Sequence, residues 1–341
     1  MMKAIFLDRD GTLNVDKGDT YRIEDFELHD GVIDGLRILG DFRLFIVTNQ
    51  SGIGRGCYTE EDLHRFNDYL HGVLKKQGIS IEKVYFSPDT HGKQDSTRKP
   101  NPYFLRQAEK EYGISLLESW MIGDRDIDME LANNAGCKGI YVLTGHGTKH
   151  LAEARLQKPS YIAANFLQAA QFITAKKETK IVERKKLSSM VRKYREKGEK
   201  IVTLNGTFDI LHKGHEKMLT EAKEQGDILI VAVNSDESVK GNKGPARPLN
   251  NERARALMIA NFDYVDCVTI FPEKTPIELL EIIRPDVHVN GSEYGSECIE
   301  AQTVGKYGGR IHIVRLLPGY SSTKIISGKS GEKELYSPHQ N

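Results

Sequence analysis

Short apolar runs alternate with longer segments of helical periodicity along most of this chain. Each run is almost continuously apolar, as in strands that are buried on both faces of a parallel sheet. The segments between the runs repeat apolar residues every three or four positions, as in the helices that connect such strands. The pattern therefore predicts an α/β fold with two Rossmann-like parallel sheets. The predicted strands lie at residues 3–7, 44–47, 83–86, 119–122 and 139–143 in the first half, and at 201–204, 227–233, 264–271, 286–289 and 310–316 in the second.

The length of the chain, 341 residues, favours two domains over one. Between the two sets of strands, residues 176–200 contain eleven Lys and Arg against four Asp and Glu. Such a basic run could bind nucleic acid, but Leu187 and Val191 recur at helical spacing, which favours an amphipathic helix with a solvated basic face. We expect a first domain at residues 1–175, this helix at 176–200, a second domain at 201–328 and a polar tail at 329–341.

The overall composition argues against several classes of partner. The 48 basic residues balance the 48 acidic ones, so no net charge attracts nucleic acid or an acidic membrane. The four cysteines have no C-x-x-C spacing, which fits incidental thiols in a reducing compartment. No apolar run has the length of a signal peptide or a membrane span. We therefore expect a cytoplasmic protein that acts on small molecules. The composition does not determine its oligomeric state, and a homo-oligomer is one of the states that it allows.

Two aspartates directly follow the first predicted strand. Asp8 and Asp10 are two positions apart, so a nearly extended backbone directs both side chains to one side. Parallel strands present their chemistry at their carboxyl ends, and carboxylates there are costly unless they are paired or bind a metal. Gly11 then lets the chain turn away from the sheet. This pattern predicts an acidic reaction centre at the end of the first strand.

The surrounding signature D-x-D-G-T-L resembles the haloacid dehalogenase (HAD) superfamily of phosphatases. The closer likeness is to heptose bisphosphate and histidinol phosphate phosphatases, through F-L-D-R-D-G-T-L-N, T-N-Q-S-G-I-G-R-G, R-K-P-x-P and I-G-D-R-x-x-D. The resemblance implies that Asp8 is the nucleophile and that Asp10 is the general acid and base. It also implies Mg2+ held by Asp8, Asp124 and the backbone carbonyl of Asp10. The residues implied to bind phosphate or substrate are Thr48, Asn49, Gln50, Arg98, Lys99 and Arg125.

The loop before R-K-P departs from this group of phosphatases. Many members carry a zinc site of three cysteines and one histidine in that loop. Here Ser87, Asp89, Asp95 and Thr97 stand at the positions expected for ligands, and His91 alone cannot hold zinc. We therefore expect no structural zinc. Because the loop departs from the pattern of the group, the resemblance defines the substrate of this domain less closely.

A second signature lies at residues 205–215, N-G-T-F-D-I-L-H-K-G-H, between an apolar run and a helix-like run. A helix that begins there presents free N–H groups and a positive dipole end to phosphate, and His212 and His215 can donate hydrogen bonds to a phosphate chain. The pattern resembles the HIGH-type nucleotidyltransferases, which include cytidylyltransferases and ADP-heptose synthase. The resemblance implies His212 and His215 as catalytic residues, with Mg2+ assisting. The residues implied to bind the nucleotide are Thr207, Phe208, His212, His215, Lys243, Arg247, Ser322 and Thr323. Lys243 and Arg247 lie in a basic segment with two glycines, residues 240–248, for which we expect a flexible loop that closes over phosphate.

The resemblances together imply a bifunctional enzyme of nucleotide-activated heptose synthesis, for lipopolysaccharide or another surface glycan. The first domain would remove the 7-phosphate of D-glycero-D-manno-heptose 1,7-bisphosphate, and the second would transfer AMP from ATP to heptose 1-phosphate. The residues themselves imply only a phosphatase and a nucleotidyl transfer. One alternative is a CTP-dependent cytidylyltransferase that acts on another sugar or polyol phosphate. Another is that one domain is catalytically silent and serves as a binding scaffold.

Overall fold

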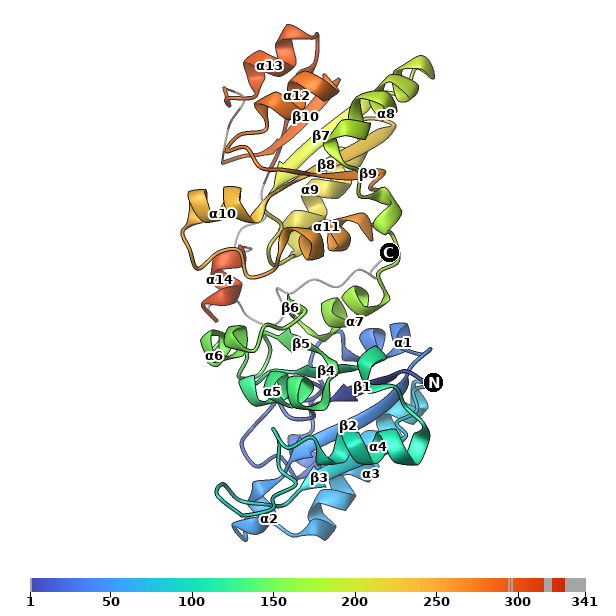
Figure 1. Cartoon of the computed structure of the whole chain (residues 1–341), viewed down its shortest axis with the longest axis vertical. Coiled ribbons are helices and arrows are strands. Elements are labelled where there is room, and N and C mark those ends of the chain that lie inside the picture. The colour runs from blue at the N-terminus through green and yellow to red at the C-terminus, as the bar shows by residue number, and fades with distance from the viewer. Residues whose placement is uncertain (1, 294, 296, 316–320, 329–341) are drawn as a thin grey trace. The chain divides into compact units, whose positions relative to one another are not determined.

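The computed structural model of the protein describes residues 2–293, 295, 297–315 and 321–328, and it separates into two units, one around residues 2–174 and one around residues 175–324 (Figure 1). Both predicted parallel sheets are confirmed. The predicted tail at 329–341 lies outside the described residues. Within the described residues, no helix combines the length and the apolar character needed to cross a membrane.

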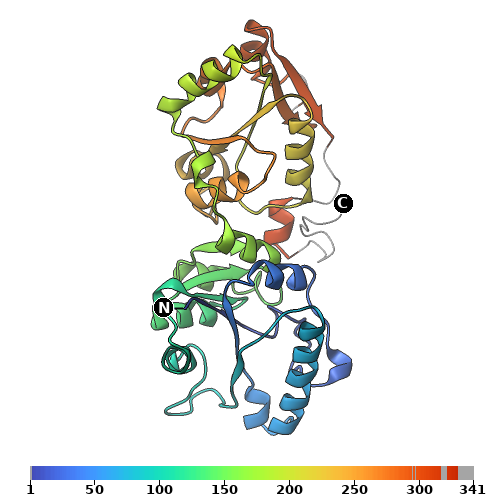
Figure 2. The same ribbon diagram turned by 90° about the vertical axis from the view of Figure 1, so that its right-hand side faces the viewer.

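The first unit contains a six-stranded sheet in the order β3-β2-β1-β4-β5-β6. Its strands are β1 (Ala4–Leu7), β2 (Arg43–Asn49), β3 (Lys83–Ser87), β4 (Trp120–Gly123), β5 (Lys138–Val142) and β6 (Tyr161–Ala163). Its helices are α1 (Val32–Ile38), α2 (Ser51–Gly54), α3 (Glu60–Lys76), α4 (Tyr103–Tyr112), α5 (Asp126–Ala135), α6 (Leu151–Leu156) and α7 (Phe166–Thr174). Helices α3 and α4 lie on opposite faces of the sheet (Figures 1 and 2).

The second unit contains a five-stranded sheet in the order β11-β10-β7-β8-β9. Its strands are β7 (Ile201–Gly206), β8 (Ile228–Asn234), β9 (Cys267–Phe271), β10 (Val287–Gly291) and β11 (Arg310–Val314). Its helices are α8 (Arg184–Glu196), α9 (Lys213–Lys223), α10 (Asp236–Lys243), α11 (Glu252–Ala260), α12 (Ile277–Ile283), α13 (Ala301–Lys306) and α14 (Ser322–Ile326), the last of which extends two residues past the unit.

The strand order of each sheet reverses beside its first strand. In the first unit β1 lies between β2 and β4, and in the second β7 lies between β10 and β8. Open α/β sheets bind ligands in the crevice at the carboxyl ends of the strands where the order reverses. Leu7 pairs with both Ile46 and Ile122, so the residues that follow these three strands meet at one edge of the first sheet.

Apolar side chains from the strands and from the helices packed against them form the core of each unit. In the first, Phe6, Phe45 and Met121 of the sheet pack against Leu105 of α4 and Leu131 of α5. Helix α1 approaches α7 so closely at Gly35 that a Cβ there would lie 2.6 Å from the ring of Phe166. In the second unit, Leu187 and Val191 of the basic helix α8 are buried against Ile201 and Cys267 of the sheet. Burial of two such side chains stabilises the unit by about 3–6 kcal/mol, so α8 contributes to its core.

One prediction from the sequence is wrong. Residues 240–248 were expected to form a flexible loop, but Lys240–Lys243 complete helix α10. The helix begins at Ser235, whose side chain accepts a hydrogen bond from Ser238 N, and it ends where Gly244 adopts a φ of 87°. The Ser-Asp-Glu start is a strong N-terminal signal that outweighs the weak helix propensities of Gly241 and Asn242.

His288 is a core residue of the second unit and makes stability depend on pH. Its side chain is fully buried on β10, with Nδ1 at 2.8 Å from Thr203 Oγ1 and no hydrogen-bond partner for Nε2 among the described residues. Burial lowers the pKa of His288 to about 4, against the raising effect of Glu300. The folded chain therefore keeps His288 neutral where an unfolded chain, with a pKa of about 6.5, binds a proton.

We expect the contribution of His288 to the stability of the second unit to be complete above pH 6.5 and to fall by up to about 3 kcal/mol as the pH drops to 4. His288→Gln should remove this contribution and leave that of the other buried histidines. Hydrogen–deuterium exchange of peptides from β7 and β10, corrected for the intrinsic rate at each pH, measures the change. An identical pH dependence in the variant and the wild type would contradict the assignment.

Candidate active sites

Asp8 lies at the carboxyl end of β1 and forms a buried ion pair with Lys99. Asp8 N donates a hydrogen bond to Ile122 O at 2.9 Å, which fixes the backbone beside β4. Lys99 Nζ lies 2.5 Å from Asp8 Oδ1 and 2.7 Å from Asp128 Oδ1, and all three residues are at most 5% exposed. The ammonium of Lys99 therefore links two carboxylates from different elements at the base of the site.

Buried carboxylates outnumber ammonium groups at the base of this site. Three carboxylates, those of Asp8, Asp124 and Asp128, offer oxygens within 4.8 Å of one another, beside the single ammonium of Lys99. Burial raises the pKa of Asp8 to about 6 in spite of the lowering effect of Lys99. Burial, and then the charges of Asp8 and Asp128, raise the pKa of Asp124 well above its usual value. Burial opposes the charge of Lys99, but Asp128 and Asp8 together raise its pKa.

This donor set fits a hard divalent cation. Carboxylate oxygens are the ligands that Mg2+ prefers, and a divalent ion would offset the excess negative charge. Asp124 is held in place because His146 N donates to its Oδ2 at 2.7 Å. Gly11 leaves room for it, since a Cβ at that position would lie 2.2 Å from Asp124 Oδ2. The carboxylate of Asp10 does not belong to this group of three carboxylates. It accepts a hydrogen bond from Gln50 Nε2.

The residues at the carboxyl end of β2 connect both aspartates of the signature to the rest of the site. Gln50 Nε2 donates to Asp10 Oδ2 at 2.8 Å and to Thr48 Oγ1 at 2.7 Å. Asn49 Oδ1 accepts a hydrogen bond from Lys99 N at 2.9 Å. Thr48, Asn49 and Gln50 line the same pocket as Asp8 and Asp10, so the structure brings these predicted site residues together.

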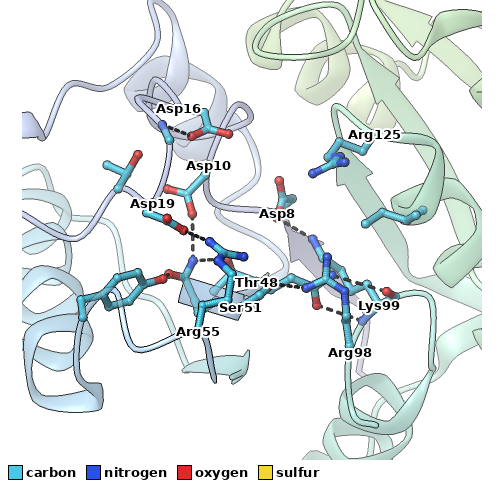
Figure 3. A pocket seen from close by; sticks show the side chains of 16 residues that line it. Asp8, Asp10, Asp16, Asp19, Thr48, Ser51, Arg55, Arg98, Lys99 and Arg125 are labelled. Atoms are coloured by element: carbon cyan, nitrogen blue, oxygen red, sulfur yellow. Dashed lines mark hydrogen bonds and ion pairs between the residues drawn. The ribbon is translucent and has the colours of Figure 1, made fainter. Parts of the chain in front are cut away.

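Three guanidinium groups surround this pocket, which has a volume of about 230 Å3 (Figure 3). Arg98 and Arg125 were predicted from the sequence to bind phosphate or substrate. Arg55 lies in the motif T-N-Q-S-G-I-G-R-G, but no role was predicted for it. Burial, followed by the charges of Arg125 and Arg55, lowers the pKa of Arg98. Arg98 Nη1 also donates to Ser51 Oγ. These like charges repel one another, so the pocket that also contains Asp8 and Lys99 favours binding of an additional anion.

The loop before Arg98 is closed by hydrogen bonds centred on Asp89. Asp89 Oδ2 accepts from Ser96 Oγ and from Thr97 N, both at 3.0 Å, and Lys93 pairs with its other oxygen. The Lys93 ammonium and these hydrogen bonds outweigh desolvation and lower the pKa of Asp89. Thr97 Oγ1 donates to Ser87 Oγ at 3.0 Å. Three of the four positions considered for zinc ligands in the sequence, Ser87, Asp89 and Thr97, thus belong to one polar network.

The second site lies at the carboxyl end of β7 and the start of α9. His212 is the N-cap residue of α9, and the ring centroids of His212 and His215 are 3.8 Å apart. Burial lowers the pKa of His212 to about 4, and burial with the neighbouring His212 and Lys243 lowers that of His215 well below its usual value. Both imidazoles are therefore neutral at pH 7 and are placed where a helix N-terminus attracts phosphate.

A larger pocket of about 440 Å3 opens beside these residues. Of the residues predicted to bind the nucleotide, those that line it are Thr207, Phe208, His215, Lys243, Arg247 and Ser322. His212 and Thr323 do not line it, and the side chain of Thr323 is exposed. Arg247 Nη2 lies 3.1 Å from Asp209 Oδ2, so part of its charge is already balanced by the protein.

The sequence alone did not identify Arg255, which organises this site. Its side chain is fully buried on α11. It donates hydrogen bonds to Thr207 O at 2.6 Å and to Asn234 O at 2.7 Å, and Nη2 lies 2.8 Å from Asp236 Oδ1. Arg255 thus fixes the turns after β7 and β8 against each other. In the sequence Arg255 lies two positions after the run R-P-L-N-N-E-R at residues 247–253, and its burial was not evident from the spacing.

Comparison with known proteins divides the chain in the same way. Residues 96–169 match a family model described as HAD-hydrolase-like, and residues 203–328 match one described as cytidylyltransferase-like. "Bifunctional protein HldE" of Koribacter versatilis is 40% identical over 204 residues, which cover 60% of this chain and 40% of the relative. The protein of the same name from Pelobacter propionicus is 37% identical over 262 residues, which cover 75% of this chain and 52% of the relative. The chain thus spans about half or less of the length of these curated relatives.

A solved D,D-heptose 1,7-bisphosphate phosphatase from B. bronchiseptica, complexed with magnesium and phosphate, is 28% identical to this chain. The alignment covers 50% of this chain and 97% of that one, with a TM-score of 0.48. The family models, together with the two parallel sheets, identify the two halves of the molecule. This chain carries a HAD-like domain followed by a cytidylyltransferase-like domain.

Proposed function

We propose that the protein is a bifunctional enzyme of nucleotide-activated heptose synthesis. The HAD-like domain, assigned to residues 1–175, hydrolyses the 7-phosphate of D-glycero-D-manno-heptose 1,7-bisphosphate. The domain at residues 201–328 transfers AMP from ATP to heptose 1-phosphate and releases pyrophosphate. The observation that carries the proposal is the buried Asp8–Lys99 pair, at 2.5 Å, in a pocket that also holds a cluster of arginines. The heptose follows from the motif resemblance, and the cytoplasm, where ATP is available, is the proposed location.

The proposed phosphatase reaction has two steps. A carboxylate oxygen of Asp8 attacks phosphorus, and the bond from phosphorus to the sugar oxygen breaks as Asp10 gives that oxygen a proton. Asp10 then takes a proton from water, whose oxygen attacks the aspartyl-phosphate and releases phosphate and free Asp8. Lys99, through its contact with Asp8, offsets the negative charge that collects at the base of the pocket.

Asp8 and Asp124, whose oxygens lie within 4.8 Å of one another and of those of Asp128, would hold Mg2+ at this site, and the resemblance adds the backbone carbonyl of Asp10. When bound, the ion supplies positive charge that reduces the repulsion between the attacking carboxylate and the phosphate.

The arginine cluster favours a substrate with two phosphate groups. The reacting phosphate lies next to Asp8 and Lys99, and Arg98 and Arg125 remain available for a second anion in the same pocket. Without that second phosphate, Arg98 and Arg125 would have no anionic group of the substrate to bind. A bisphosphate is therefore the substrate class that this pocket accommodates best.

The proposed nucleotidyl transfer needs no protein nucleophile. A phosphate oxygen of the sugar 1-phosphate attacks the α-phosphorus of ATP, and the bond to the β-phosphate oxygen breaks. His215 and Lys243 lie at the pocket wall, where hydrogen bonds and charge can stabilise the transferring phosphate chain. Since these groups recognise phosphate, the choice between ATP and CTP rests on the resemblance to ADP-heptose synthase.

Single substitutions should separate the two activities. Asp8→Asn should lower phosphate release from the bisphosphate by at least about 10³-fold, because the nucleophile is lost. His215→Ala should lower pyrophosphate release by about 10²- to 10³-fold, because a donor to the transition state is lost. Each variant should keep the other activity and so serves as the control for its partner. If either variant kept both activities, the corresponding domain would be a binding scaffold.

Removal of one arginine should discriminate between substrates. Arg98→Ala should lower kcat/KM about 10- to 100-fold for heptose 1,7-bisphosphate, as expected for the loss of a charge-assisted hydrogen bond. The loss should be smaller than threefold for heptose 7-phosphate, which lacks the second phosphate group. Arg106→Ala, at an exposed arginine on α4, is the matched control. Equal losses on both substrates would contradict a second anion site at Arg98.

The nucleotide can be identified by pyrophosphate release from the intact chain. With heptose 1-phosphate as acceptor, we expect kcat/KM for ATP to exceed that for CTP by at least about tenfold, a difference of about 1.4 kcal/mol in transition-state binding. A preference for CTP would replace the ADP-heptose assignment by the cytidylyltransferase alternative. Release of pyrophosphate with glycerol 3-phosphate but not with heptose 1-phosphate would replace the sugar.

A further inference from the structure

Arg9, the residue between the two aspartates of the HAD signature, is fully buried. Its guanidinium lies 4.6 Å above the ring centroid of Phe66, so it is removed from solvent on one face. A buried cation is costly unless partners satisfy its charge and its N–H groups. The contacts of Arg9 therefore indicate why the chain places an arginine at this position.

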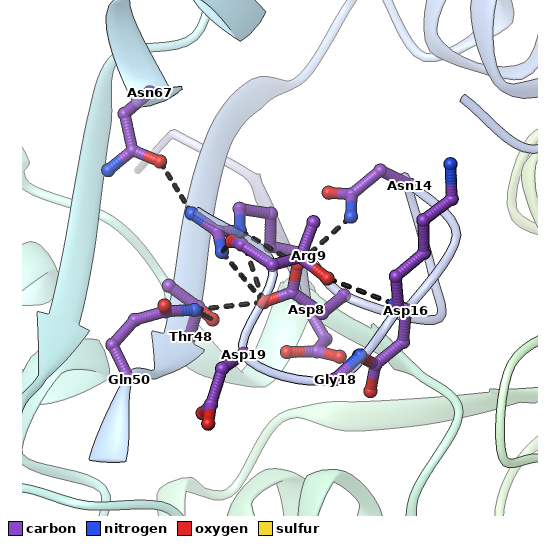
Figure 4. Close-up of polar contacts among 12 residues, drawn as sticks. Asp8, Arg9, Asn14, Asp16, Gly18, Asp19, Thr48, Gln50 and Asn67 are labelled. Atoms are coloured by element: carbon purple, nitrogen blue, oxygen red, sulfur yellow. Dashed lines mark hydrogen bonds and ion pairs between the residues drawn. The ribbon is translucent and has the colours of Figure 1, made fainter. Parts of the chain in front are cut away.

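Asp10 is the main partner of Arg9, and Figure 4 shows Arg9 in contact with another partner, Asn67. Arg9 Nε lies 3.1 Å from Asp10 Oδ1 and 3.2 Å from Oδ2, and Nη2 donates to Oδ2 at 2.9 Å. The same guanidinium donates from Nη1 to Asn67 Oδ1 at 2.9 Å and from Nη2 to Thr20 O at 2.6 Å. One rigid fork thus contacts the Asp10 carboxylate, helix α3 and the loop that contains Thr20.

The remaining contacts of Asp10 fix the plane of its carboxylate. Asn14 Nδ2 donates to Oδ1 at 2.9 Å, and Gln50 Nε2 donates to Oδ2 at 2.8 Å. Arg9 differs from these two residues because it contacts both oxygens. Asp10 faces the pocket with only 17% of its side chain exposed, so its orientation is set by these donors.

We propose that Arg9 is a positioning residue that orients the Asp10 carboxylate for proton transfer to the leaving-group oxygen. The inference rests on the proposed phosphatase activity and on the role of Asp10 within it. Arg9 also holds Thr20, and residues 18–20 line the same pocket, so it ties the proton donor to the loop that faces the substrate. A small displacement of a proton donor costs much of its contribution, because transfer requires hydrogen-bond distance to the reacting oxygen.

Lysine cannot replace Arg9 in this role. Arginine presents five N–H groups in a planar fork, whereas lysine offers three donors from a single atom. Arg9→Lys keeps the buried charge, but one ammonium cannot contact both Asp10 oxygens, Asn67 Oδ1 and Thr20 O in the observed arrangement. Arg9→Lys therefore removes the planar arrangement of donors and keeps the positive charge. Arg9→Met removes both the donors and the charge.

The experiment compares two substrates that differ in the basicity of the leaving group. Nitrophenolate leaves p-nitrophenyl phosphate readily without a proton, whereas phenolate, a much stronger base, benefits from protonation. We expect Arg9→Lys to lower kcat/KM for phenyl phosphate by about 10- to 100-fold, a part of the 10²- to 10⁴-fold that general acid catalysis provides. The loss for p-nitrophenyl phosphate should be below threefold. Arg9→Met should show the same selectivity if it folds, as judged by circular dichroism.

Asp10→Asn gives the reference for complete loss of the proton donor. In that background Arg9→Lys should not change the ratio of the two kcat/KM values further, because the group that it positions is absent. Equal losses on both esters in Arg9→Lys would overturn the proposal and leave Arg9 with a packing role only. A further change of the ratio in the double variant would also overturn it.

The wild-type enzyme and Asp8→Asn separate this inference from the proposed function. Hydrolysis of the aryl esters that depends on Asp8, without hydrolysis of heptose 1,7-bisphosphate, would refute the sugar and leave the test of Arg9 valid. Failure of the wild type on the aryl esters and on the bisphosphate would refute the phosphatase, and with it the role of Arg9.

Discussion

The contact of one lysine with two buried carboxylates governs the organisation of the first domain. Lys99 reaches Asp8 at the end of β1 and Asp128 on α5, so the loop before α4 must extend over the carboxyl edge of the sheet. A lone carboxylate at that depth would favour its neutral form, which is a poor nucleophile. The ammonium therefore sustains the charge that the proposed reaction needs. The loop hydrogen bonds around Asp89 and the amide of Asn49 hold Lys99 and Arg98 where they can act.

In the proposed function both domains bind phosphate, but the groups at the reaction centre of each domain differ. The HAD-like domain has an excess of buried carboxylates, which suits a covalent reaction assisted by a divalent cation. The cytidylyltransferase-like domain instead presents a helix N-terminus, imidazoles and basic side chains, which suits a reaction that depends on positioning. Both sites lie where the strand order of a parallel sheet reverses. In the proposed sequence, the product of the first chemistry is the acceptor in the second.

The sequence predicted the features that repeat along the chain or follow a strand directly. Apolar runs marked all the strands from β1 to β5, and Asp8 and Asp10 could be placed because the carboxyl end of a buried strand has a known relation to the sheet. Residues whose role depends on distant partners were missed. Arg9 and Arg255 look like ordinary surface arginines in the sequence, and only the fold reveals that carbonyls and carboxylates from other segments surround them. The predicted loop at residues 240–248 began too early. Gly241 and Asn242 have weak helix propensities, so the sequence did not show that α10 continues to Lys243.

The stacked, uncharged imidazoles of His212 and His215 give the second pocket a charge that depends on its contents. Without ligand, burial keeps both rings neutral, and they do not repel each other at 3.8 Å between centroids. A polyphosphate brings negative charge next to them and makes protonation favourable. In the proposed reaction we expect His215, which lines the pocket, to bind a proton from solvent when the nucleotide enters and to release it when pyrophosphate leaves.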